Sequence, residues 1–374
     1  MPQDLSAVPQ WRDGFGCAVF ARRAMMRPVA KSRLKAGTPV ALSDVRSRAE
    51  WLGFSLTLPA RGLIKPPMKT TIRAIALGVA VLCLPSVLAA GTIRVATYNL
   101  ENYMDRDVGT RHAKSAEAKA KIHECIRALN PDVIALQEMG SPEALQELRT
   151  SLKTDGLDFP FWEHVTGFDT NIHVAVLSRF PFAARRPHTN EFFLLGGRRF
   201  QVSRGFAEVD VKVGDGYSFT LITTHLKSRR PVPVADEAEL RLEEARLLRE
   251  KIDARLAANP NANLIVLGDF NDTRDSRSTR EIIGRGRFKL TDTRPAERNG
   301  DNAPNLNPAW EPRNITWTHY YGKDDTYSRI DYILLSPGMA REWVTNETYV
   351  LTLPNWGIGS DHRPLVAAFS AQDK

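Results

Sequence analysis

The chain has 374 residues, of which 43% are hydrophobic and 25% charged, values typical of a soluble globular protein of one large domain or two. Its formal net charge of +8 is concentrated in residues 1–90, which carry 13 Lys and Arg against 4 Asp and Glu, while the remaining residues carry 38 against 39. The overall positive charge therefore does not indicate a polyanionic partner such as a nucleic acid. Only a local cluster of basic residues could indicate one.

The three cysteines exclude a disulfide framework and a cysteine metal site, because Cys17, Cys83 and Cys125 lie in unlike regions without a suitable spacing. Only Cys125 falls in the part of the chain with regular periodicity. Its neighbours Ile122 and Ile126 indicate a core helix residue rather than a nucleophile.

The first 90 residues fall into two parts. Residues 1–67 show no periodicity from which a helix or strand can be predicted, whereas residues 68–90 combine basic residues, an apolar run over 74–84 and an end of small residues. That order is typical of a secretory signal peptide. A transmembrane anchor is the alternative interpretation, although the run is short for a membrane span and Pro85 interrupts its end.

A signal peptide has to be N-terminal to act, so we expect translation to start at Met68 and residues 1–67 to be a non-native or disordered extension. Cleavage after Ala89 or Ala90 would leave a mature protein whose one domain spans residues 91–374. The predicted location is therefore the periplasm or the outside of the cell. We expect the mature chain to be a monomer with no stable membrane anchor.

Strand-like and helix-like segments alternate from Thr92 onward, which indicates an α/β protein. Asn130 and Pro131 end the first helix, and Ser141 with Pro142 has the N-cap and first-turn signature of the second. Helices are predicted at 113–129, from 141 onward and at 236–256. Strands are predicted at 92–98, 132–136, 173–178, 201–213, 217–224, 264–267, 315–318, 329–335, 345–351 and 365–369, with a hairpin turn at 214–216 and a surface loop at 299–313.

The stretch at 264–272 shows a feature that recurs along the chain. Four apolar residues in a row predict a strand buried on both faces, and Gly268 ends it. Asp269 and Asn271 follow at i and i+2, which points both side chains to the same side, where an oxygen-rich pocket could hold a hard cation or a phosphate. The alternative is a polar turn that closes a core strand, and Asp272 is interpreted as such a turn residue.

Polar residues also follow or close other apolar runs, where a buried carboxylate is costly unless it is paired or bound to a metal. Their recurrence at strand ends predicts one shared pocket at one edge of the sheets. The residues are Asn99, Glu101, Glu138, His225, Asp269, Asn271, Asp331, Asp361 and His362.

Six short motifs around these residues resemble, in their order, those of the endonuclease/exonuclease/phosphatase superfamily, the deoxyribonuclease-I-like proteins. They are TYNLE at 97–101, LQE at 136–138, THL at 224–226, GDFN at 268–271, RIDY at 329–332 and SDHRP at 360–364. The resemblance covers about residues 92–369. It implies an α/β (α+β) fold, a four-layer sandwich of two mixed β-sheets flanked by helices, with the site at one end of the sheets.

The resemblance implies a phosphoric ester hydrolase that uses a divalent cation, Mg²⁺ or Mn²⁺. Carried over by motif, Glu138 would be the principal metal ligand, with Asn99 and Asp361 nearby and Glu101 in a secondary role. Oxygen ligands of this kind suit Mg²⁺ or Mn²⁺ better than Zn²⁺.

The same resemblance assigns the reacting groups. His362 would be a general base or charge stabiliser oriented by Asp331, and Asp269 would position or deprotonate the attacking water. Asn271 and His225 would hold phosphate oxygens. A histidine backed by a carboxylate suits acid–base chemistry near neutral pH, but which of Asp269 and His362 activates the water stays open.

Several residues near these motifs have two interpretations. Arg204 faces the phosphate or lies on the surface, and the basic residues after His225 form a rim with Arg198 and Arg199 or are solvated loops. Those residues are Lys227, Arg229 and Arg230. Aromatic residues at 310–321 either stack on bases or pack. The other histidines match no motif and are interpreted as surface or structural; they are His112, His123, His164, His173, His188 and His319.

We therefore predict an exported, metal-dependent phosphodiesterase that is nuclease-like, with a phosphate ester such as DNA or RNA as its partner. A phosphomonoesterase or phospholipase-type hydrolase acting on a lipid or sugar phosphate is the alternative. A catalytically silent binding protein of the same fold is a second alternative, which the completeness of the constellation disfavours.

Overall fold

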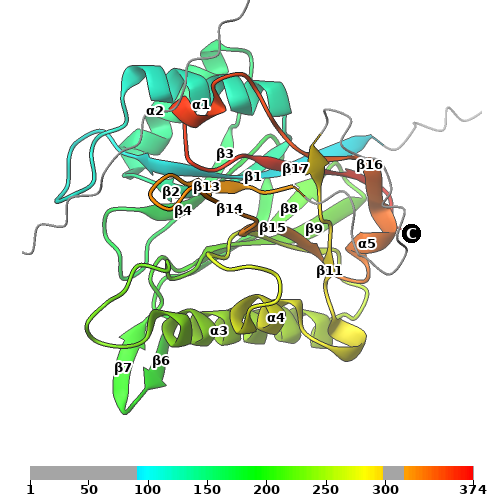
Figure 1. The fold of residues 1–374 in the computed structure, drawn as a ribbon. Helices are drawn as coiled ribbons and strands as arrows, with labels where there is room; N and C mark the ends of the chain where they lie inside the picture. Colours follow the sequence, from blue (N-terminus) through cyan, green and yellow to red (C-terminus); the bar gives the residue numbers. More distant parts are fainter. Residues whose placement is uncertain (1–90, 298–315, 374) are drawn as a thin grey trace, which may run out of the picture. The chain divides into compact units, whose positions relative to one another are not determined.

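The computed structural model describes residues 91–297 and 316–373. The expected extension at 1–67, the signal peptide at 68–90 and the surface loop at 299–313 lie outside them. Two mixed β-sheets face each other across a shared core, and helices cover both outer faces (Figure 1). This four-layer arrangement is the one predicted from the motifs.

The first sheet joins both ends of the described chain. Its central strands β1 and β2 are parallel, and β17 pairs antiparallel with the other edge of β1. Within the described residues its order is β12 (Ala296–Glu297), β16 (Trp343–Val350), β17 (Leu365–Ser370), β1 (Thr92–Tyr103), β2 (Val133–Met139), β4 (His173–Ser178) and β3 (Phe161–Val165).

The second sheet repeats the parallel pairing at its centre, with β9 beside β10. Its order is β11 (Thr291–Asp292), β15 (Asp331–Leu335), β10 (Leu264–Asp269), β9 (Tyr217–His225), β8 (Phe206–Val213) and β5 (Phe182–His188). Two small hairpins complete the described strands: β6 (Phe192–Leu195) with β7 (Arg198–Gln201), and β13 (His319–Tyr321) with β14 (Thr326–Ser328).

The helices lie outside the sheets, with α1 and α2 along one side and α3 and α4 along the other (Figure 1). Ser115, Ser141, Asp236 and Ser276 cap the N-termini of the first four helices with their side chains, which satisfies backbone N–H groups that have no partner within the helix. The helices are α1 (Ala116–Leu129), α2 (Pro142–Thr154), α3 (Glu237–Ala258), α4 (Arg277–Ile283) and α5 (Met339–Glu342), with 3₁₀ turns at Gly286–Phe288 and Trp356–Ile358.

Three apolar clusters hold the layers together. One lies between the sheets, one under α1 and α2, and one under α3 and α4. The strand at Leu264–Asp269 is buried along its whole length, as predicted, because its alternate residues contribute to two of these clusters. Each fully buried Leu or Ile contributes about 1.5–3 kcal/mol to stability. The clusters fix the strands whose ends carry the polar residues.

Several predicted elements have different bounds. The strand expected at 201–213 is two strands, β7 and β8, because Gly205 between them has φ 67°, a left-handed value that interrupts a ladder. The strand expected at 315–318 is wrong for residues 316–318, which precede β13 and form no strand, and Ile315 lies outside the described residues. The first helix begins at Ala116 rather than at 113, since Ser115 caps it.

Among the described residues, no helix is long and apolar enough to cross a membrane.

Candidate active site

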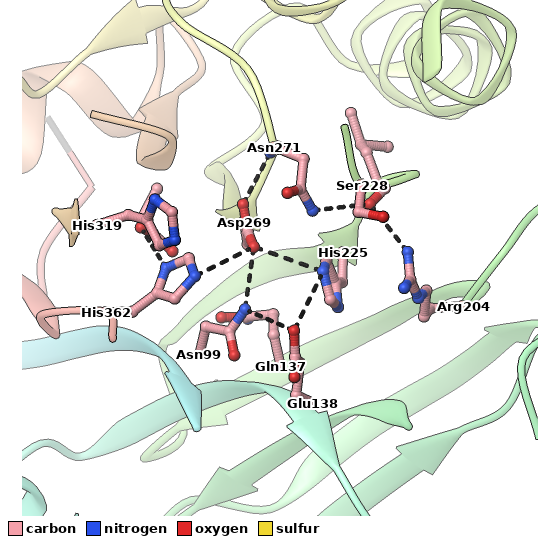
Figure 2. Close-up of polar contacts among 12 residues, drawn as sticks. Asn99, Gln137, Glu138, Arg204, His225, Ser228, Asp269, Asn271, His319 and His362 are labelled. Carbon is pink, nitrogen blue, oxygen red and sulfur yellow. Dashed lines mark hydrogen bonds and ion pairs between the residues drawn. The ribbon is translucent and has the colours of Figure 1, made fainter. Parts of the chain in front are cut away.

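The predicted site residues come together where the two sheets present their strand ends. The parallel pairing of β9 and β10 places His225 opposite Asp269, and the antiparallel pairing of β10 and β15 places Asp331 on its other side. Asn99 Nδ2 in the first sheet donates to Asp269 Oδ2 in the second at 2.9 Å. Figure 2 shows these side chains converging from both sheets. The polar residues predicted at the strand ends therefore lie close together, at the ends of strands from both sheets.

The backbone is strained at several of these strand ends. Glu101, Glu138 and Asn271 have φ of 46°, 57° and 54°, which non-glycine residues adopt at a cost. Gly268 has φ 129°, and a Cβ there would lie 2.1 Å from the carbonyl oxygen of Thr224. Only glycine fits this close approach, so Gly268 allows β10 to continue into Asp269 beside β9.

His362 is buried and held by a carboxylate. Its Nδ1 lies 2.9 Å from Asp331 Oδ2, and Thr318 Oγ1 donates to the same oxygen at 2.6 Å. Burial lowers the pKa of His362, but the charges of Asp331 and Asp269 outweigh burial and raise the pKa well above 6.5. His362 is therefore an imidazolium near neutral pH, with Nε2 directed toward Asp269 Oδ2 at 3.8 Å.

Asp269 is the most connected carboxylate of the site. Its Oδ1 accepts from the backbone N–H of Asn271 at 2.7 Å, and its Oδ2 lies 3.4 Å from His225 Nε2. Burial raises the pKa of Asp269 to about 7, helped by repulsion from Asp331 and opposed by His362. A carboxyl group with such a pKa exchanges a proton near neutral pH.

His225 is buried and uncharged. Burial and the positive charges of Arg204 and His362 lower its pKa well below 6.5. Arg204, for which two interpretations were open, is buried, donates to the Leu226 carbonyl oxygen at 3.2 Å and lies 3.8 Å from Asp169 Oδ2. Arg204 is therefore not a surface residue, and its guanidinium contributes positive charge behind His225.

Carboxylates crowd the side of the site nearer the first sheet. Glu138 Oε2 accepts from the backbone N–H of Asn102 at 2.9 Å, and Glu138 Oε1 lies 3.8 Å from His225 Nε2. Burial, Asp361 and Glu138 all raise the pKa of Glu101, against the opposing effect of Lys114. The Nζ of Lys114 lies 3.4 Å from Glu101 Oε2. Lys114 therefore faces Glu101. Against the effect of burial, His319 and His362 lower the pKa of Asp361, the carboxyl group that they face.

Asn271 and Asp272 have different hydrogen-bond partners. Asn271 Nδ2 donates to the Leu226 carbonyl oxygen at 3.0 Å, which turns its side chain toward the end of β9 (Figure 2). Asp272 accepts from Arg229 Nη2 at 3.3 Å and Arg241 Nε at 3.0 Å. Asp272 is therefore a structural anchor outside the reacting group.

Some of the basic residues predicted to form a rim beside the site have side chains that hydrogen-bond within the protein. The side chain of Arg229 is bound by Asp272 and by the Asn271 carbonyl oxygen, and Lys227 Nζ donates to the Ser228 and Arg230 carbonyl oxygens at 2.9 Å each. Arg198 and Arg199 are exposed on the β6–β7 hairpin. The loop after β9 therefore uses much of its hydrogen-bonding capacity to hold its own shape.

Two residues of the site were missed by the sequence analysis. His319, interpreted as surface or structural, lies with its ring centroid 4.5 Å from that of His362, and β13 bridges to the backbone of His362 (Figure 2). Thr318 donates a hydrogen bond to Asp331. This contact could not be predicted, because a threonine before a strand has no sequence feature that identifies it as a hydrogen-bond donor to a carboxylate. The sequence TWTH at 316–319 precedes RIDY by ten residues, and a hairpin returning to that motif was the one available clue.

Comparison with known proteins gives a family and a fold. A model described as the Endonuclease/Exonuclease/phosphatase family matches residues 96–362. No match is found among curated protein sequences. Among solved structures, truncated TDP2 of Caenorhabditis elegans is 17% identical with a TM-score of 0.50, covering 75% of this chain and 98% of the other.

Two further structures are similar to the same degree. A Staphylococcus aureus beta toxin structure is 17% identical with a TM-score of 0.51, covering 74% of this chain and 99% of the other. The human Nocturnin catalytic domain with a bound sulfate anion is 18% identical with a TM-score of 0.50, covering 75% and 95%. At these identities the likeness shows the fold alone, which is the two-sheet sandwich described above.

Proposed function

The chain belongs to the endonuclease/exonuclease/phosphatase family, and from this premise we propose that it is an exported, divalent-metal-dependent phosphodiesterase with nuclease-like specificity. The families in that name share the hydrolysis of phosphate esters. One observation carries the proposal. Asp269 accepts hydrogen bonds from Asn99 and Asn271, and His225 and His362 lie beside the same carboxylate. These residues come from separate strand ends.

The donor set fits a divalent cation. Three carboxylates, Glu101, Glu138 and Asp361, lie close enough that two of them raise the pKa of the first. The ammonium of Lys114 faces Glu101. The imidazoles of His319 and His362 face Asp361, and the ligand atoms of these three residues lie within 4.8 Å of one another. A cation between the carboxylates would relieve their repulsion, and oxygen donors of this kind suit Mg²⁺ or Mn²⁺.

Glu138 would be the principal ligand, with Asn99 and Asp361 beside it and Glu101 in a secondary role. The backbone N–H of Asn102 orients Glu138, and Glu101 N–H donates to Asn99 Oδ1 at 2.9 Å. When bound, the cation supplies positive charge to a phosphoryl oxygen and stabilises the charge that develops there.

The protonation states of Asp269 and His362 support different roles for the two residues. Asp269, with its pKa raised to about 7, takes the proton of the attacking water. His362 is an imidazolium at the same pH, so it donates a hydrogen bond from Nε2 to a phosphoryl oxygen rather than acting as the base. Asp331 and Thr318 hold His362 in the orientation for this role.

Asn271 and His225 complete the phosphate contacts. His225 is neutral, and its Nε2 points into the group formed by Asp269 and Glu138. Asn271 Nδ2 has a second N–H beyond the one used by the Leu226 carbonyl oxygen. Both residues therefore offer donors to non-bridging oxygens without placing a further charge in the site.

The exposed aromatic side chains of the β13–β14 hairpin favour a nucleic acid. Tyr327 is 59% exposed and Tyr321 is 43% exposed, on the hairpin that carries His319 to His362. Bases stack on such rings at about 1–3 kcal/mol each, independently of sequence. The ring centroid of Tyr321 lies 6.4 Å from that of His319, and we propose that the base next to the scissile phosphodiester stacks on this hairpin.

A lipid phosphate is the second candidate, and one observation favours it. On the β6–β7 hairpin, Leu194 is 72% exposed and Phe192 is 38% exposed, and Arg199 lies 3.9 Å over the Phe192 ring. Exposed apolar groups beside arginines suit an anionic lipid surface. The two candidates predict different substrates for the same reacting groups.

The test is a hydrolysis panel with Mg²⁺ or Mn²⁺. The substrates are single- and double-stranded DNA, RNA, phospholipid vesicles and sugar phosphates. The proposal expects the highest kcat/KM on a nucleic acid and none with EDTA. If phospholipid is the preferred substrate, the second candidate replaces the first. If none of the esters is hydrolysed, the result favours a catalytically silent binding protein. Export rests on residues 68–90 and is tested by sequencing the N-terminus of the native protein, expected at Ala90 or Gly91.

A further inference from the structure

His319 is a third histidine beside the reacting groups, and the proposed mechanism leaves it without a role. It begins β13, and its ring is tilted 45° against that of His362. Its Nε2 lies 3.6 Å from Asp361 Oδ2, while His362 Nε2 lies 3.8 Å from Asp361 Oδ1. One carboxylate is thus flanked by two imidazoles that each face a different oxygen.

The separation of His319 and Asp361 is informative. At 3.6 Å the two atoms are too far apart for a hydrogen bond. Two ligands of one ion, each at about 2.0–2.2 Å from it, lie about 3.0–3.5 Å apart in octahedral or tetrahedral geometry. A small closure therefore makes the pair a nitrogen and an oxygen ligand of the same cation.

The other nitrogen of His319 has a partner that leaves Nε2 available to a cation. His319 Nδ1 shares a hydrogen bond of 3.5 Å with Ser328 Oγ across the hairpin, which leaves Nε2 as the nitrogen that faces the site. The ligand atoms of His319, Asp361 and His362 all lie within 4.8 Å of one another. A metal-bound histidine commonly has its second nitrogen held in this way, because the contact fixes the ring orientation.

The backbone fixes the pair as well. His319 bridges to His362, and the N–H of Tyr320 donates to the Asp361 carbonyl oxygen at 3.0 Å. The β13–β14 hairpin is therefore tied to the segment that carries Asp361. This connection keeps His319 beside Asp361 without any contribution from the ion.

We propose that His319 Nε2 is a nitrogen ligand of the cation that Asp361 binds, and that it gives the site a preference for Mn²⁺ over Mg²⁺. Mg²⁺ favours oxygen ligands, whereas imidazole nitrogen binds the first-row transition ions more strongly. The inference rests on the proposed function for the existence of the cation, and it adds a ligand and a metal preference to it.

Pulsed electron paramagnetic resonance of bound Mn²⁺ tests this, because a directly bound imidazole couples its ¹⁴N nucleus to the ion. We compare the wild type with His319→Gln, His319→Tyr, His362→Gln and His112→Gln. His112 is an exposed histidine, so its variant controls for loss of any imidazole. His319→Tyr keeps an aromatic ring against His362 in case His319→Gln does not fold.

The expected result is nitrogen coupling in the wild type, His112→Gln and His362→Gln, and its loss in a folded His319 variant. The Kd for Mn²⁺ of that variant should rise at least about tenfold, with a smaller change for Mg²⁺. Bound Mn²⁺ without nitrogen coupling in the wild type, coupling that persists in a folded His319 variant, or no Mn²⁺ binding would overturn the inference. Hydrolysis is measured separately, so coupling without hydrolysis counts against the proposed function alone.

Discussion

Nδ1 of His362 lies 2.9 Å from Oδ2 of Asp331, with both side chains buried and Thr318 bound to the same carboxylate oxygen. This contact joins a loop before β17 in one sheet to the first residue of β15 in the other. It sets the charge of His362, and through that charge it affects Asp269 as well. The first two predictions follow from it.

Replacing Asp331 by Asn keeps the size of the side chain but removes the charge that holds His362 as an imidazolium. We expect kcat to fall by about 10²–10⁴-fold with a smaller change in KM, because the lost interaction acts mainly in the transition state. Steady-state kinetics on bis(p-nitrophenyl) phosphate measures this. Asp132→Asn, in the residue before β2 and at the end opposite Glu138, is the control, and an equal loss in both variants would indicate general destabilisation.

The pH profile of kcat/KM should be bell-shaped. Activity requires Asp269 without its proton and His362 with one, so the rate rises as pH passes the raised pKa of Asp269, about 7, and falls as pH passes the raised pKa of His362. In Asp331→Asn the pKa of His362 should fall, because Asp331 raises it, and the high-pH limb should move to lower pH. A profile that does not move would exclude this coupling.

Gly268→Ala should be among the most destabilising single substitutions in the described chain. The new Cβ would lie 2.1 Å from the Thr224 carbonyl oxygen at a φ of 129°. We expect a loss of at least about 3 kcal/mol in the free energy of unfolding. Urea denaturation measures it. Gly216→Ala, where no atom lies within 4 Å of the new Cβ, should be close to neutral.

Glu208 should make stability depend on acid pH. Burial raises its pKa, but His188, Arg186 and Arg255 lower the pKa from 4.5 to about 2. Its contribution is therefore complete above pH 4.5 and is lost as pH falls toward 2. Glu208→Gln should cost about 2 kcal/mol at pH 7, less than a fully buried pair because its arginines are partly exposed. The difference from wild type should shrink steadily below pH 4.5, and a constant difference in urea titrations would contradict this.

The sequence predicted the central strands better than the edges. The strands ending at His225 and Asp269 were found because they are continuous apolar runs buried on both faces. The edge strand β5 was missed, since its sequence, FAARRPH, has no β-branched residue and contains Pro187. The break at Gly205 was missed because a positive φ is not evident from a glycine within a strand-like run.

The predicted site residues meet as expected, but their supports could not be predicted. Motif order identified Asp331 and His362, because each stands in a recognisable sequence. Thr318 and His319 depend on a hairpin that returns the chain to Asp331, a contact set by tertiary pairing of β13 with β14. Lys114 likewise reaches Glu101 only because the start of α1 packs beside the end of β1.

The central claim is that these strand ends form one hydrolytic site, and it is tested most directly by hydrolysis of bis(p-nitrophenyl) phosphate with Mn²⁺. We compare the wild type with His362→Ala and Glu138→Ala, all confirmed as folded by circular dichroism. The account predicts activity that EDTA abolishes and that each substitution lowers by at least about 10³-fold. Unchanged activity in His362→Ala would contradict it.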